Sequence, residues 1–143
     1  MNPVTLLSSL LLVVGLVVVT NAQTYAQDIT GTWINAAEDT KMVIYKGRRN
    51  TKTTRYNEDP SKYYGRVVWS KTGAIANNTK LITKFSPYGN KTYKNGKVLH
   101  PRNGREYEGY LQLLESGDLK VRKYVNKSIV GTTEIWKKGE GSN

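Results

Sequence analysis

The chain contains no cysteine and a single histidine, His100, and these two shortages exclude several kinds of site. Without cysteine there is no disulfide framework, no thiol nucleophile and no lipid-bearing cysteine after the hydrophobic N-terminus. The protein must therefore depend on its hydrophobic core, and a chain of 143 residues is long enough to form one. We expect a single domain.

Residues suited to catalysis or to metal binding are scarce. The chain has no Gly-x-Ser-x-Gly motif, and His100 stands beside a predicted turn, where a structural role is commoner than a catalytic one. The pairs Glu38-Asp39 and Glu58-Asp59 lie in predicted turns, while Glu106 and Glu108 share the polar face of a predicted strand. We therefore assign no catalytic residue, no metal ligand and no cofactor.

Helical periodicity over eleven or more residues is also missing after the N-terminal apolar run. Short segments that alternate between apolar and polar residues, with turns between them, are typical of a β-sandwich or a closed barrel. The strand around Leu111 shows this alternation, because Tyr107, Gly109, Leu111 and Leu113 share one face. The expected strands are 28–35, 41–45, 63–70, 81–85, 91–94, 96–100, 105–113, 119–125 and 132–137.

Sequential hairpins favour an up-and-down antiparallel barrel of about eight strands over a Greek key. Pro101 and Gly104 suit a tight turn, because proline fixes φ and glycine accepts a positive φ. Asn95-Gly96 predicts a further hairpin turn. A barrel of eight strands has room inside for side chains or one small ligand. The expected core consists of Trp33, Val67, Trp69, Leu111, Leu113, Leu119, Val121 and Trp136.

The N-terminus carries an apolar run over residues 6–19 that is shorter than the roughly 20 residues of a membrane span. Small residues follow it, so we predict a signal peptide over 1–26 and a mature domain over 27–143. No lysine or arginine precedes the run, and an uncleaved anchor is the alternative. With cleavage, the mature form has no transmembrane segment. We expect an exported protein, periplasmic or secreted.

Charge is distributed unevenly in this chain, whose net charge is +11. Residues 41–105 contain 16 Lys or Arg and two acids, a local charge of +14. Such a field attracts anionic glycans, lipid head groups, phosphates and nucleic acid, although predicted export argues against nucleic acid. The alternative is a solvated surface that only keeps the protein soluble. The tentative ligand-binding residues in this region are Arg48, Arg49, Arg55, Tyr64, Arg66 and Trp69.

Lys123 is the remaining tentative ligand-binding residue. It interrupts the apolar face formed by Leu119, Val121 and Val125, and a buried ammonium group is costly unless it is paired. One interpretation places Lys123 inside the barrel, paired with Glu134 and facing an anionic ligand. The other is a β-bulge at Arg122-Lys123 that turns the Lys123 side chain to solvent and Tyr124 inward.

Several short motifs resemble, in order, those of a bacterial exported family known as domain of unknown function number 2147. The resemblance implies a lipocalin-like barrel in which Trp33 packs at the closed end near Lys137 or Lys138. His100 stands where the family usually has Asp, and Lys123 where it usually has Gly. The matching residues are Gly31-Thr32-Trp33, Tyr64-Gly65-Arg66-Val67-Val68-Trp69, Gly96-Lys97-Val98, Pro101, Asn103-Gly104, Tyr107, Leu119-Lys120-Val121-Arg122, Tyr124, Gly131-Thr132 and Trp136; of these, Trp33, Gly65, Pro101, Gly104 and Trp136 are expected to be structural.

The family has no settled activity, so the resemblance implies fold and compartment alone. Non-catalytic binding of a small or amphiphilic ligand in or at the barrel is our leading hypothesis. The alternative is a basic surface module that adheres to anionic glycans, lipids or other anionic polymers of the cell envelope. Both hypotheses leave the ligand's identity open.

Overall fold

A computed structural model of the protein describes residues 28–49, 57–126 and 130–140. The expected signal peptide over 1–26 and the expected ligand-binding residue Arg55 lie outside these ranges. Across the described ranges, no helix has the length and hydrophobicity needed to cross a membrane.

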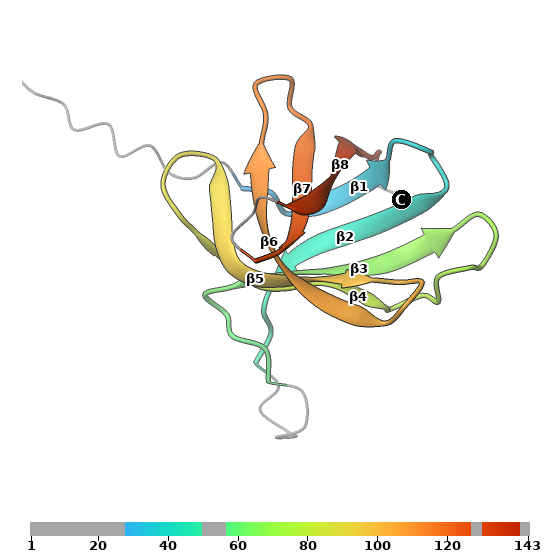
Figure 1. Ribbon diagram of the computed structural model, residues 1–143, viewed down its shortest axis with the longest axis horizontal. Helices are drawn as coiled ribbons and strands as arrows, with labels where there is room; N and C mark the ends of the chain where they lie inside the picture. The colour runs from blue at the N-terminus through green and yellow to red at the C-terminus, as the bar shows by residue number, and fades with distance from the viewer. Residues whose placement is uncertain (1–27, 50–56, 127–129, 141–143) are drawn as a thin grey trace, which may run out of the picture.

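The structure is all-β, and its eight antiparallel strands follow one another around a closed barrel (Figure 1). β1 closes the ring by pairing with β8 as well as with β2, for example through Trp33 opposite Lys138. The predicted up-and-down barrel is thus confirmed. The strands are β1 (Gly31–Asn35), β2 (Thr40–Lys46), β3 (Tyr63–Ser70), β4 (Lys80–Pro87), β5 (Thr92–His100), β6 (Arg105–Leu113), β7 (Leu119–Val125) and β8 (Val130–Lys138).

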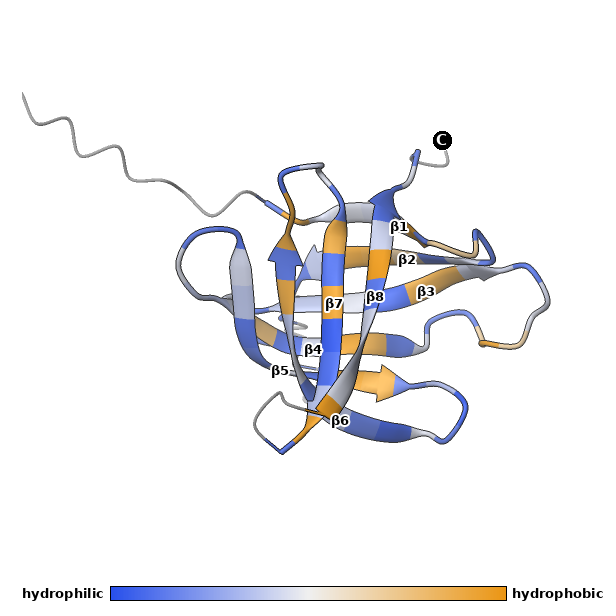
Figure 2. Cartoon of the chain, turned by 45° about the horizontal axis from the view of Figure 1, so that its top comes forward, coloured by the Kyte–Doolittle hydropathy of each residue, from blue (hydrophilic) through white to orange (hydrophobic). Residues whose placement is uncertain are grey.

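Alternation of apolar and polar residues determines which side chains form the core, and Figure 2 shows it clearly along β7. Successive side chains of a strand point to opposite faces, so Leu119 and Val121 are buried while Lys120 and Arg122 face outward. Leu113 is half-buried and packs against the core. The buried apolar residues include Trp33, Met42, Ile44, Val67, Ile82, Phe85, Tyr93, Leu111, Leu119, Val121 and Trp136.

The prediction that Trp69 belongs to the core is wrong. Met42 pairs with Val67 but Lys41 pairs with Trp69, so Val68 is an extra residue in β3. Such a bulge reverses the facing of the residues after it. Trp69 is therefore 39% exposed on the outer surface, where Lys41 Nζ lies 5.6 Å from its ring centroid.

The predicted hairpin turn at Asn95-Gly96 is also a bulge, because β5 continues through it. Asn95 has a positive φ of 64°, and the register against β6 shifts between Tyr93 and Gly96. A Cβ atom at Gly96 would lie 2.5 Å from Phe85 Cδ2, so the ring of Phe85 occupies the space that a side chain would need. The sequence thus correctly predicted a residue with positive φ at this point, but the residue forms a bulge within β5 and not a hairpin turn.

One end of the barrel is closed around Trp33, where β1 begins and β8 finishes. The indole Nε1 of Trp33 donates a 2.9 Å hydrogen bond to the carbonyl oxygen of Ile29, and both residues are buried. Lys138 Nζ lies 4.6 Å from the Trp33 ring centroid and donates to the Thr30 carbonyl at 2.9 Å. Of the two bases expected near Trp33, Lys138 is thus the one that covers it.

A candidate ligand cavity

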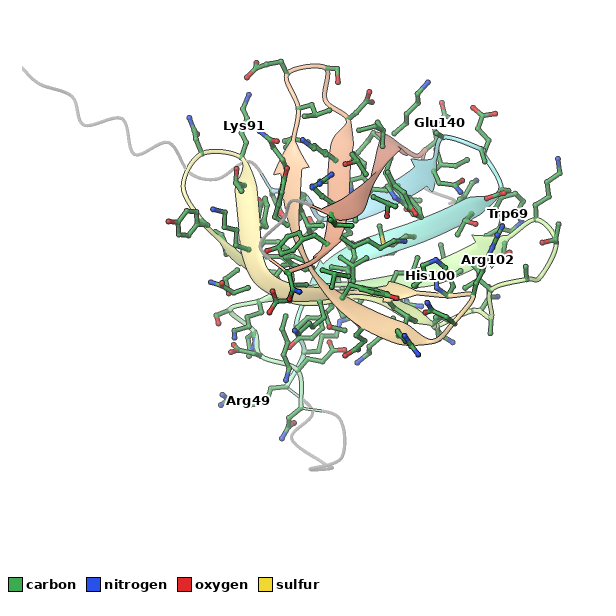
Figure 3. All side chains as sticks on the ribbon, in the orientation of Figure 1. Arg49, Trp69, Lys91, His100, Arg102 and Glu140 are labelled. Carbon is green, nitrogen blue, oxygen red and sulfur yellow. The ribbon has the colours of Figure 1, made fainter. Side chains whose placement is uncertain are left out.

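The opposite end of the barrel contains a cavity of about 300 Å³. The loops β1–β2, β3–β4 and β5–β6 all lie at this end, and Figure 3 shows Arg102 of the β5–β6 loop there. A volume of this size is at the lower limit of ordinary ligand pockets. The lining residues are Asn35, Asp39, Thr40, Met42, Ser70, Thr72, Ala74, Ile75, Leu81, Ile82, Val98, Leu99, Pro101, Arg102, Val121, Lys123, Glu134 and Trp136.

The wall of the cavity has apolar and polar surface in similar amounts. Five strands each contribute at least one buried apolar side chain to it, namely Met42 of β2, Ile82 of β4, Val98 of β5, Val121 of β7 and Trp136 of β8. The wall is therefore more polar than that of a usual small-molecule site, which is predominantly apolar.

Lys123 lines this cavity, and no bulge turns it away. The registers of β7 against β6 and β8 run without a shift from Leu119 to Tyr124, so Lys123 keeps the inward facing of Val121. Its Nζ lies 3.4 Å from Glu134 Oε1, and the two side chains are 14% and 51% exposed. The interpretation that places Lys123 inside, paired with Glu134, is therefore correct, and the bulge interpretation is wrong.

This ion pair leaves Lys123 with unused hydrogen-bonding capacity. An ammonium group has three donors, whereas Lys123 makes one hydrogen bond, to Glu134, within the described ranges. A contact of 3.4 Å is long for a charge-assisted hydrogen bond. The cation is mostly buried while its partner is half exposed, and both side chains line the cavity.

Trp136 also lines the cavity, and its indole Nε1 is a buried donor that makes no hydrogen bond in the described part of the chain. The side chain has an exposed fraction of 4%. A buried donor without a partner is unusual, because each such group costs free energy of about 1–3 kcal/mol. Sequence reasoning treated Trp136 as structural and missed this N–H group.

The polar groups of the β1–β2 loop form hydrogen bonds with one another. Asp39 Oδ1 accepts hydrogen bonds from Asn35 Nδ2 at 2.7 Å and from Thr40 Oγ1 at 2.9 Å. Asn35 Oδ1 in turn accepts from the backbone N–H groups of Asp39 and Thr40, each at 3.1 Å. The hydrogen bonds from Asn35 and Thr40 hold the pKa of Asp39 below its ordinary value. These groups line the cavity, and Asp39 Oδ1 and both side-chain polar atoms of Asn35 are already engaged within the loop.

Arg102 is exposed and has no hydrogen bond or ion pair within the described residues. Ser70 also lines the cavity, because the β3 bulge turns it inward opposite Thr40. Sequence reasoning missed both residues. Arg102 lies between Pro101 and Gly104 in the predicted turn, and a turn position does not indicate a cavity. Ser70 follows the β3 bulge, which the alternation of apolar and polar residues in β3 does not reveal.

Three of the other expected ligand-binding residues, Arg48, Tyr64 and Arg66, lie on the outer side of the barrel near Tyr45 and Glu58. Glu58 Oε1 accepts a hydrogen bond from the Tyr45 hydroxyl at 2.9 Å and pairs with Lys80 Nζ at 2.6 Å. Burial acts to raise the pKa of Glu58, but the hydrogen bonds from Lys80 and Tyr45 lower it below its ordinary value overall. Burial and the bond to Glu58 raise the pKa of Tyr45 to about 12.

Tyr64 and Arg66 belong to this outer cluster and are also engaged. Tyr64 is buried, stacks with Tyr45 at 6.1 Å between ring centroids, and accepts a hydrogen bond from the Asp59 N–H. Arg66 donates to Asn78 Oδ1 at 2.7 Å. These contacts give both residues a structural role.

Arg48 and Arg49 are exposed at the other end of the barrel, and Figure 3 shows Arg49 far from Arg102. The guanidinium of Arg48 lies 5.9 Å from the Tyr45 ring centroid. The structure therefore brings Lys123 into the cavity and leaves Arg48, Arg49 and Trp69 outside it.

In the described residues, no group of three or more His, Cys, Asp or Glu side chains is arranged to hold a metal ion. His100 lies beside Tyr107, with 6.4 Å between the ring centroids, and its Nδ1 has no partner among the described residues. Glu106 and Glu108 are exposed on the outer face, as predicted.

The closed barrel with a tryptophan at one end and a cavity at the other is the architecture of a lipocalin-like protein. A solved structure from Helicobacter pylori, protein HP1028, which is described as belonging to the lipocalin family, matches with a TM-score of 0.58 and 16% sequence identity. The match covers 79% of this chain and 84% of that one, and it shows a shared fold.

A family model matches residues 31–138, and it is described as "Uncharacterized protein conserved in bacteria (DUF2147)". The chain belongs to this family, as the sequence motifs implied. No curated protein matches the chain.

Proposed function

We propose that this protein binds a small ligand, without catalysis, in the cavity of its barrel. The observation that carries the proposal is a cavity of about 300 Å³ whose lining includes Lys123, a mostly buried cation with unused donors, and Trp136, whose buried Nε1 has no partner among the described residues. Buried polar groups normally have partners, so these donors support a site for a ligand with acceptor atoms.

The test is to isolate the protein under native conditions from the cells that make it and to measure its mass by native mass spectrometry. A retained small molecule is expected, and it should be absent from Val121→Phe, in which a larger side chain occupies the cavity. Val43→Phe, the same change on the outward face of β2, is the matched control. The proposal fails if the parent carries no ligand and also binds nothing from a library of small molecules in a Val121→Phe-sensitive way.

A second candidate function is adhesion to anionic glycans or lipids of the cell envelope. Several exposed aromatic rings carry a lysine ammonium above them, most closely at Tyr88, where Lys94 Nζ lies 4.1 Å from the ring centroid. Trp69 with Lys41 and Tyr110 with Lys120 repeat the arrangement. Rings and cations side by side suit sugars and lipid head groups.

Adhesion is tested by retention on a heparin-like or anionic-lipid matrix. The variant with Arg48, Arg49, Lys52 and Arg55 replaced by Ser should elute at lower salt than the parent, because exposed charges attract a polyanion at long range and are screened by salt. Its melting temperature should not change. Elution at the parent's salt concentration would reject this use of the segment.

We further propose that the protein acts outside the cytoplasm, after removal of a signal peptide over residues 1–26. The apolar run and the small residues after it support this proposal. The intact mass of the exported protein should lack about 22–26 residues. A species that still begins at Met1 would instead indicate an anchor.

A further inference from the structure

We propose that the ligand of this cavity is a small organic monocarboxylate whose carboxylate contacts Lys123 Nζ and whose far end offers an acceptor oxygen to Trp136 Nε1. The proposal rests on the proposed binding function and adds the chemical class of the ligand. It derives from the charge, the position and the volume of the groups around the cavity.

The charge of the ligand is set by which polar groups are unused. On the β1–β2 side, Asp39 Oδ1 and Asn35 Oδ1 already accept hydrogen bonds from neighbours within the loop. On the β7–β8 side, Lys123 retains free donors and Trp136 Nε1 has no partner among the described residues. The Glu134 carboxylate also lines the cavity but is half exposed to water, so the buried groups with unused capacity are the two donors, and the complementary ligand is an anion with acceptor atoms. Trp136 Nε1 is itself covered, so the ligand meets it with a small shift of the indole ring.

A single negative charge fits better than two, because Glu134 lies beside the cation. Its Oε1 is 3.4 Å from Lys123 Nζ, so an anion that approaches the ammonium group also approaches a carboxylate. Attraction to Lys123 and repulsion from Glu134 both scale with the charge of the ligand and partly offset each other, whereas the cost of removing the ligand from water rises more steeply with its charge. A carboxylate is therefore favoured over a phosphate dianion.

The orientation of the ligand is set by the register of β7 and β8. Trp136 is opposite Leu119, Glu134 is opposite Val121, and Lys123 lies two residues further toward the loop end. Trp136 is thus deep in the barrel while Lys123 is near the mouth, and Val121 lies between them on the cavity wall. A ligand that meets both donors lies along the barrel, with its apolar middle against Val121.

The volume limits the size of the ligand. About 300 Å³ corresponds to roughly ten waters at a liquid volume of about 30 Å³ each. A ring or short chain of that size fits, and a long-chain fatty acid does not fit within the walls.

Isothermal titration calorimetry of the full mature domain with three planar probes of equal size tests the head group. Benzoate, benzamide and benzamidinium differ chiefly in charge, and benzoate should bind about tenfold more tightly than benzamide, because a hydrogen bond to a charged group is the stronger kind. Benzamidinium should bind least. Phenyl phosphate should bind more weakly than benzoate, and tighter binding of phenyl phosphate would overturn the carboxylate assignment.

Substitution of Lys123 tests its proposed contact with the ligand's carboxylate. Lys123→Met should abolish the preference for benzoate over benzamide and leave the affinity for benzamide within about twofold. Lys120→Met, which removes an outward lysine of the same strand, is the matched control and should change neither affinity. An unchanged preference in Lys123→Met would overturn the proposed contact with the carboxylate.

The far-end contact is tested with 4-hydroxybenzoate, which adds one oxygen opposite the carboxylate. The parent should bind 4-hydroxybenzoate more tightly than benzoate. Trp136→Phe, which retains a ring but lacks the N–H, should bind the two compounds with equal affinity. Equal binding to the parent would overturn this contact. Tighter binding of benzamide than of benzoate would reject the carboxylate and keep the binding function, whereas no Val121→Phe-sensitive binding of any probe or library compound would reject both.

Discussion

Trp33 and Trp136 are both buried, on neighbouring strands of one barrel, yet their indole N–H groups are in opposite situations. Trp33 Nε1 donates to the Ile29 carbonyl at 2.9 Å, under the ammonium group of Lys138. Trp136 Nε1 has no partner within the described ranges, and the Trp136 side chain lines the same cavity as Lys123. One indole N–H is used by the fold, and the other is left to the proposed ligand.

The difference agrees with the proposed separation of structural and binding roles. Polar groups that stabilise the fold are satisfied, as at the closed end and around Glu58 on the outer face. Lys123 and Trp136, the two residues with unused donors, both line the cavity. Natural proteins commonly sacrifice stability at functional sites.

The largest expected difference in the free energy of unfolding is between the variants in which Trp33 or Trp136 is replaced by phenylalanine. Trp33→Phe leaves the buried Ile29 carbonyl without its donor, which should cost about 1–3 kcal/mol in addition to the loss of ring volume. Trp136→Phe loses ring volume but no hydrogen bond, so Trp33→Phe should be the more destabilised variant by about that amount. Urea unfolding measures both free energies, and equal losses would contradict the contrast between the two sites.

A smaller effect is expected from the two lysines, one at each end. Lys138→Met removes a hydrogen bond to Thr30 and a cation–π contact with Trp33, which should cost about 1–2 kcal/mol. Lys123→Met replaces a mostly buried ammonium group that has one long contact, and Glu134 remains half exposed to water. Its free energy of unfolding should be unchanged or higher, because burying a poorly paired charge is unfavourable. A loss as large as that of Lys138→Met would show that Lys123 is structural.

The smallest expected effect is the pH dependence of stability that arises from Glu58 and Tyr45, which are hydrogen-bonded to each other on the outer face. The pKa of Glu58 is lowered in the folded protein, so its contribution to stability is present above pH 4.5 and is lost as the pH falls below that value. The pKa of Tyr45 is raised from 10.0 to about 12, so its contribution is present below pH 10 and is lost as the pH rises toward 12.

These two losses are measured as the free energy of unfolding across pH, in the parent and in two variants. Glu58→Gln should reduce the acid loss, and Tyr45→Phe should reduce the alkaline loss. Parallel curves for the parent and both variants would mean that the cluster contributes nothing through ionisation.

The fold was largely predictable because strand alternation and turn residues report directly on local structure. The errors at Trp69 and Asn95 have one cause, since a bulge adds a residue and reverses the facing of later residues without altering the composition of the strand. Lys123 stood out because it interrupts an apolar face. Trp136 did not, because whether a buried N–H has a partner depends on backbone positions that alternation does not describe.

The most direct measurement of the central claim compares the two buried tryptophans in one spectrum. The protein has three tryptophans, so a ¹⁵N-labelled sample should give three indole N–H signals, assigned with Trp→Phe variants. On titration with 4-hydroxybenzoate, the Trp136 signal should move to saturation while the Trp33 signal stays in place. A Trp136 signal that does not move, or that moves no more than that of Trp33, would contradict the account.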